Sequence, residues 1–159
     1  MSLTWPGLPR PGQEVGKQTA TSQAKLGQLT LDQQANYLTD GFWYDAYGSS
    51  QHHFDVHAGG SLTVNLTRLS ANAQTVAKYA LQTWTNVSGL KFVETTAAGA
   101  INFSENKSGA YANSNYAGSI ISDSSVNIAS DWVNYGWYYV QTYIHEVGHA
   151  LGLGHAGNY

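Results

Sequence analysis

The chain has 159 residues, enough for one domain with a buried core, and 42% of them are hydrophobic. Its seven Lys and Arg residues form no cluster and the formal net charge is −3, so we do not expect a nucleic-acid partner. No apolar run approaches the ~20 residues that a membrane span requires, so we expect no membrane partner either. Cysteine is absent, which excludes disulfides, thiolate zinc sites and cysteine nucleophiles and leaves histidine and carboxylate as metal ligands.

The first 28 residues carry all three prolines and show no sustained hydrophobic periodicity. We interpret residues 1–28 as an extended N-terminal arm and residues 29–159 as the folded unit. The N-terminus lacks the basic and then apolar pattern of a signal peptide. Either the protein stays inside the cell, or its export signal lies in sequence that is not present here.

A helix is predicted to follow the arm. Thr30 and Gln33 form a T-x-x-Q capping box, and apolar residues share one face of the segment 31–39. The segment GFWYDAY, residues 41–47, forms an aromatic cluster that we expect to pack in the core.

A second group of histidines follows in the segment Q-H-H-F-D-V-H. His53, Asp55 and His57 would share one face of a strand and could bind a metal. The spacing matches no fixed metal motif, so we favour a solvated polar segment here.

The middle of the chain predicts a strand, a helix and further strands. Leu62, Val64 and Leu66 alternate, which is typical of a half-buried strand at 61–66. Ser70 can cap a helix that runs to about Val87. Strands are expected at 90–94, 100–104, 116–121 and 125–129, and a last helix at about 138–152. This order predicts a small mixed sheet with helices on one side.

The last helix carries the residues with the clearest chemistry. His145 and His149 are four residues apart, so on a helix both can grip one ion. Glu146 follows the first ligand and can reach a water in the open coordination position. Zinc lowers the pKa of such a water toward neutrality, and a carboxylate can then take its proton.

A third histidine follows after a bend. Gly152 lies three residues after His149 and permits the positive φ that brings His155 back toward the same ion, while Gly154 loosens the same bend. The full pattern is H-E-x-x-H-x-x-G-x-x-H.

This pattern resembles the metzincin metalloproteases, and its wording, YIHEVGHALGLGHAGNY, is close to that of the serralysin-like enzymes. Three upstream segments are also similar to that family: LDQQANYLTDGFW, SLTVNL with AQTVAKYALQTWTNVSGLKFVE, and AINFSENKSGAYA. The resemblance covers roughly residues 25–159.

The resemblance implies a secreted, zinc-dependent endopeptidase that hydrolyses polypeptides through metal-activated water. One catalytic Zn²⁺ would be held by His145, His149 and His155, with Glu146 as the general base. The implied fold is α+β (zincin-like): a twisted, mostly parallel five-stranded sheet with an antiparallel edge strand, and two long helices, the second carrying the motif. The substrate would lie along that edge strand, which we expect at Tyr116, Ala117, Gly118, Ser119 and Ile120.

The sequence departs from the family after the third histidine. Family members continue to a methionine turn below the metal, but the one methionine here is Met1, and Tyr159 lies too soon after His155 to replace the tyrosine of that turn. No G-G-x-G-x-D repeat is present, so calcium is not predicted by that route. We expect a piece of a longer protease, possibly with the remainder as a second chain; a naturally short relative is the alternative.

Two functions stay open at this point. The chain is the catalytic part of a zinc endopeptidase, or it is a noncatalytic zinc- or peptide-binding module. The arm at 1–28 is in turn either a prosegment that covers the cleft or a disordered tail.

Overall fold

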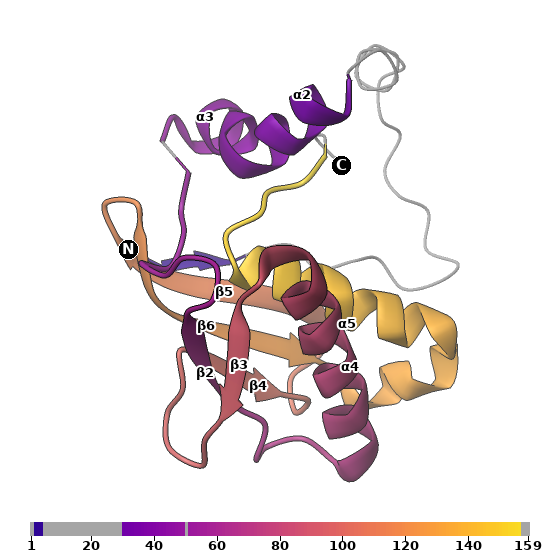
Figure 1. Ribbon diagram of the computed structural model, residues 1–159. Coiled ribbons are helices and arrows are strands. Elements are labelled where there is room, and N and C mark those ends of the chain that lie inside the picture. The colour runs from indigo at the N-terminus through magenta and orange to yellow at the C-terminus, as the bar shows by residue number, and fades with distance from the viewer. Residues whose placement is uncertain (1, 5–29, 50, 157–159) are drawn as a thin grey trace.

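The computed structural model describes residues 2–4, 30–49 and 51–156. Its centre is a six-stranded sheet with the strand order β1-β5-β6-β4-β2-β3 (Figure 1). The strands are β1 Ser2–Thr4, β2 Ser61–Asn65, β3 Lys91–Glu94, β4 Ile101–Ser104, β5 Ala110–Ala117 and β6 Ile120–Ile128. β2, β3, β4 and β6 run parallel, whereas β5 runs antiparallel to β6 and β1 antiparallel to β5.

Two long helices pack side by side against the sheet (Figure 1). They are α4 Ala71–Ser88 and α5 Trp137–Ala150, and α5 also contacts β5 and β6. A shorter helical unit lies near the C-terminal end of the described chain (Figure 1). It consists of α2 Leu31–Asn36, the π-helical turn η1 Tyr37–Gly41 and α3 Phe42–Tyr47, and we call it the α2–α3 unit. The 3-10 helix η2 Ser130–Tyr135 leads into α5.

α4 begins and ends where the sequence predicts. The Ser70 side chain accepts a hydrogen bond from the Ala73 amide, and Gly89 takes the left-handed conformation with φ 71° at the other end. The buried face of α4 is mostly alanine, so α5 can approach closely, and the Trp84 indole N–H donates to the Ile144 carbonyl of α5 at 2.8 Å. This packing fixes the height of α5 above the sheet.

The predicted fold class is confirmed. Four parallel strands and one antiparallel strand form the expected five-stranded sheet, and the second of two long helices carries the histidine motif. A sixth strand, β1, comes from the arm, where we predicted none; residues 5–29 of the arm lie outside the described residues.

The strand predicted at 116–121 is wrong in its bounds. β5 ends at Ala117, Gly118 turns with φ 61°, and β6 begins at Ile120. The antiparallel strand is therefore Ala110–Ala117, and β1 pairs along its outer side, so β5 is not the outermost strand. Its buried face consists of Ala110, Ala112 and Ser114, small or polar residues that give no hydrophobic alternation in the sequence.

The first helix continues beyond its predicted end. The π-helical turn carries it from Tyr37 to Gly41, and GFWYDAY is helical as well. Phe42 and Trp43 are buried, as predicted for this aromatic cluster, whereas Tyr44 is 71% exposed.

Candidate metal centre

Three histidine rings meet at the end of α5. His145 and His149 lie one helical turn apart on α5, and His155 comes from the segment that follows the helix. The Nε2 atom of His149 lies 2.8 Å from Nε2 of His145 and 2.8 Å from Nε2 of His155. In the described part of the chain, this is the one group of three or more His, Asp or Glu ligand atoms close enough together to share a metal ion.

The hydrogen bond on the far side of His149 sets its tautomer. Its Nδ1 lies 2.8 Å from the Leu153 carbonyl oxygen, which can only accept, so Nδ1 carries the ring proton. Nε2 of His149 therefore presents a lone pair toward the other two rings. Metal-binding histidines commonly show this arrangement, in which a carbonyl orients the ring from behind.

Burial keeps the three rings neutral. It lowers the pKa of His145 to about 4 and that of His149 to about 3, with smaller contributions from the neighbouring histidines. Burial also lowers the pKa of His155. Since only the neutral imidazole can bind a metal, the rings are in the ligand form at neutral pH. Three neutral nitrogen donors fit zinc well.

Glu146 is enclosed beside the first ligand. Its side chain is 0% exposed on α5. Burial raises the pKa of Tyr138, and the negative charge of Glu146 raises it further. The Glu146 carboxylate is therefore close enough to the Tyr138 hydroxyl for the two groups to interact electrostatically. A buried carboxylate costs free energy, and such groups are commonly retained for chemistry or binding.

The bend between His149 and His155 depends on two glycines in different ways. Gly152 has φ 105°, which confirms the predicted positive φ. Gly154 does not have a positive φ. Its role is space: a Cβ atom there would lie 2.4 Å from the ring of Phe42.

Residues of the α2–α3 unit contact this bend, and no pattern in the sequence predicts these contacts. The Gly154 amide donates to the Leu38 carbonyl at 2.7 Å, and the Trp43 indole N–H donates to the Gly152 carbonyl at 2.9 Å. We predicted Trp43 only as a core residue. A buried tryptophan needs an acceptor for its N–H, which is a signal that a partner exists but not where it lies.

An open pocket of about 370 Å³ borders the histidines. His145, His149 and His155 all line this pocket, together with apolar side chains that include Leu38, Ile144 and Leu153. Solvent and small ligands can therefore reach the ligand atoms.

His52, His53 and His57, the second histidine group, do not form a metal site within the described part of the chain. His53 and His57 are exposed, in agreement with a solvated segment. His52, however, is buried at 4% exposure between the rings of Trp43 and Tyr116, with ring centroids 4.1 and 4.0 Å away. Burial lowers its pKa, and the interpretation as a solvated residue is wrong for His52.

The residues expected to bind substrate lie at the β5–β6 hairpin. Tyr116 and Ala117 end β5, Gly118 and Ser119 form the turn, and Ile120 begins β6. The structure does not bring them together as one edge strand.

None of the helices in the described residues combines the length and the apolar character that a membrane span requires.

No family model matches the chain. It is 32% identical over 95 residues to "Serralysin" of Photorhabdus luminescens, which covers 52% of this chain and 20% of that protein. It is also 31% identical over 98 residues to "Serralysin" of Photorhabdus sp. (strain Az29), covering 54% and 20%. The chain thus spans about a fifth of the length of these curated relatives.

Among solved structures, the chain is similar to two of myroilysin. One has a TM-score of 0.44 and 24% identity, covering 61% of this chain and 50% of that one. The other has a TM-score of 0.45 and 23% identity, covering 80% and 58%. The sequence relatives confirm the predicted resemblance to serralysin-like metalloproteases over about half of the chain.

Proposed function

We propose that this chain carries the zinc site and general base of a metalloendopeptidase. The observation that supports this most is the convergence of three neutral imidazoles, in which Nε2 of His149 lies 2.8 Å from Nε2 of His145 and 2.8 Å from Nε2 of His155. A buried glutamate, Glu146, is next to the first of them in the sequence. His145, His149 and His155 would hold one zinc ion. The similarity to serralysins supports the same assignment.

Glu146 would act as the base and then as the acid. Bound zinc supplies a Lewis acid that polarises a peptide carbonyl and lowers the pKa of water to near neutrality. Glu146 would accept the proton of the attacking water and return it to the departing amine nitrogen. Its buried position excludes bulk water, which strengthens its electrostatic effect on the reaction.

The substrate would be a polypeptide bound in extended form along β5. Antiparallel pairing to a strand uses backbone groups, which explains recognition without strong side-chain selectivity. The outer side of β5 can accept such a partner, since Leu3 already pairs with Ser114 there. Tyr116, Ala117, Gly118, Ser119 and Ile120 would contact the substrate at the end of this edge.

The pairing of β1 with β5 supports a prosegment role for residues 1–28. An arm that occupies the edge on which substrate would pair competes with substrate directly. As a serralysin-like protease, the protein would act outside the cell, and the remainder of a longer protease would be its partner, in the same or a second chain.

The test is hydrolysis of casein and of a quenched fluorescent peptide. The chain, and a longer chain if the reading frame continues past Tyr159, are assayed with Zn²⁺, with a chelator, and as the Glu146→Gln variant. The proposal predicts zinc-dependent cleavage that the chelator abolishes and Glu146→Gln lowers by about 10²–10⁴-fold without loss of zinc.

A noncatalytic zinc- or peptide-binding module gives a different result. Zinc binding with no cleavage by any of these chains would favour that module. Failure of every chain to bind zinc would contradict the metalloendopeptidase and the zinc-binding module, and would leave only a peptide-binding module.

A further inference from the structure

The segment that carries His155 is held from outside α5. After the helix ends at Ala150, the chain turns at Gly152, whose amide donates to the His149 carbonyl at 2.9 Å. Two hydrogen bonds then tie this segment to the α2–α3 unit: the Trp43 indole N–H donates to the Gly152 carbonyl, and the Gly154 amide donates to the Leu38 carbonyl. The position of His155 therefore depends on a unit that lies more than one hundred residues earlier in the sequence.

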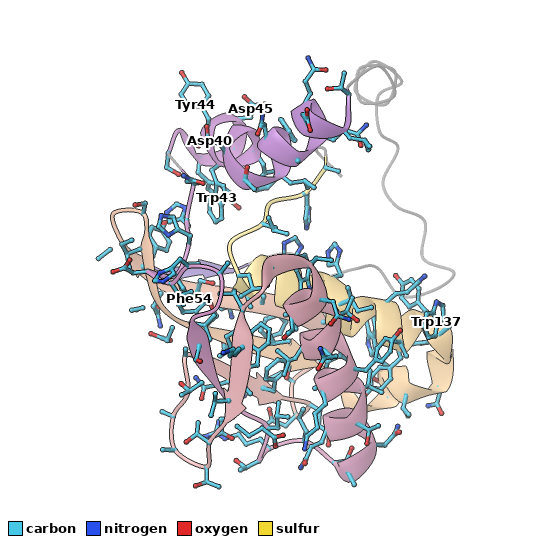
Figure 2. All side chains as sticks on the ribbon, viewed as in Figure 1. Asp40, Trp43, Tyr44, Asp45, Phe54 and Trp137 are labelled. Carbon is cyan, nitrogen blue, oxygen red and sulfur yellow. The ribbon has the colours of Figure 1, made fainter. Side chains whose placement is uncertain are left out.

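Trp43 makes the central contact of this unit. Its side chain is 1% exposed and its indole N–H donates to the Gly152 carbonyl at 2.9 Å, in a buried environment. Figure 2 shows Trp43 on the side of α3 that faces the sheet. The His52 ring packs against it at a tilt of 51°, with the ring centroids 4.1 Å apart, so the indole has little freedom to move.

The close approach of other groups leaves the turn little space. A Cβ atom at Gly152 would lie 1.9 Å from the carbonyl oxygen of His52, and one at Gly154 would strike the ring of Phe42. The Phe42 ring also lies 5.7 Å from the ring of His155, centroid to centroid. The turn is thus enclosed by backbone of the 52–53 segment on one side and by α3 on the other.

We propose that Trp43 is a positioning residue for the third metal ligand: through the Gly152 carbonyl it holds the turn that presents His155 to the ion. This inference rests on the proposed function, in which the three histidines bind zinc. Partners one layer outside the ligands commonly set metal affinity, and their loss costs about 10–100-fold.

The experiment compares two tryptophans of the 159-residue chain. Trp43→Phe keeps an aromatic ring but removes the N–H that reaches Gly152. Trp132→Phe is the matched control, since this tryptophan is also 1% exposed, but its ring packs against Tyr135 and Tyr138 beside the start of α5. Zinc affinity is measured by competition with a chelating dye, and the visible spectrum of the Co²⁺-substituted chain reports the ligand set.

The expected result is a loss of zinc affinity of about 10-fold or more in Trp43→Phe. Its Co²⁺ spectrum should move toward that of His155→Ala, while Trp132→Phe keeps the original spectrum even if both variants unfold at lower urea concentration. A structural role alone would lower stability in both variants and change neither spectrum, and that outcome would overturn the proposal.

Two further outcomes are decided in the same assay. If Trp43→Phe does not fold, Trp43→Met replaces it, because this variant also keeps a large apolar side chain and removes the N–H that reaches Gly152; unchanged zinc affinity in this variant would overturn the proposal. If the unaltered chain binds no zinc, the proposed function fails together with this inference, whereas normal zinc binding by Trp43→Phe overturns the inference alone.

Discussion

The Nε2 atoms of His149 and His155 lie 2.8 Å apart although one belongs to α5 and the other to the segment beyond it. Gly152 makes this possible through its φ of 105°. The Leu153 carbonyl, within the same bend, orients the His149 ring. One short turn therefore brings His155 to His149 and fixes the tautomer of His149.

Zinc should stabilise the chain through all three histidines. We expect added Zn²⁺ to raise the unfolding temperature, because a ligand that binds the folded state selectively stabilises it. His149→Ala should weaken zinc binding by more than the ~100-fold that follows from losing an outer hydrogen-bond partner. Calorimetric titration measures this, and the exposed His57→Ala variant is the control that should bind zinc normally.

The apoprotein should lose stability as the pH falls. Burial places the pKa of His145 at about 4 and that of His149 at about 3, below the ordinary value of 6.5, so the unfolded chain binds these protons first. Stability is therefore fully present above pH 6.5 and decreases as the pH falls from 6.5 toward 4. Urea unfolding of the metal-free chain at several pH values checks this.

A histidine variant separates this effect from general acid sensitivity. In His149→Gln the decrease in stability between pH 6.5 and 4 should be smaller than in the unaltered chain. Equal slopes in the two proteins would contradict the link to the buried rings.

Ser124 should contribute to the stability of the metal-bearing helix. Its hydroxyl donates to the Ala150 carbonyl at 2.9 Å and lies 2.8 Å from the Ser114 hydroxyl, and it is fully buried. Ser124→Ala leaves both partners unsatisfied, which we expect to cost about 1–3 kcal/mol of unfolding free energy. The exposed Ser122→Ala in the same strand should cost less than about 0.5 kcal/mol.

The arm should compete with substrate. Removal of residues 1–4 takes β1 away from β5 and should raise kcat/KM for peptide substrates, mainly through a lower KM, because the freed edge is where substrate would pair. Steady-state kinetics of the active form measures the effect. An unchanged KM in this deletion and in a deletion of residues 1–28 would show that the arm is not a prosegment.

The parts of the fold that the sequence predicts well are those with a local cause. Ser70 and Gly89 mark the ends of α4 because capping is decided by adjacent residues. The histidine ligands are equally local, since a helix brings residues four apart together. The α+β class and both long helices follow from such signals.

The parts that could not be predicted depend on contacts between distant segments. The bounds of β5 could not be predicted, because its buried positions are Ala110, Ala112 and Ser114, which are too small or too polar to give a hydrophobic alternation. The burial of His52 depends on Trp43 and Tyr116, and no pattern around His52 indicates either contact. Trp43 likewise contacts Gly152 only in the folded chain, so the sequence could not predict its hydrogen bond to the bend between His149 and His155.

X-ray absorption at the zinc edge of the zinc-loaded chain tests the central claim most directly. The account predicts one zinc per chain with three imidazole nitrogens at about 2.0–2.1 Å, and the loss of one of them in His155→Ala. A chain that retains no zinc, or a spectrum that His155→Ala leaves unchanged, would contradict it.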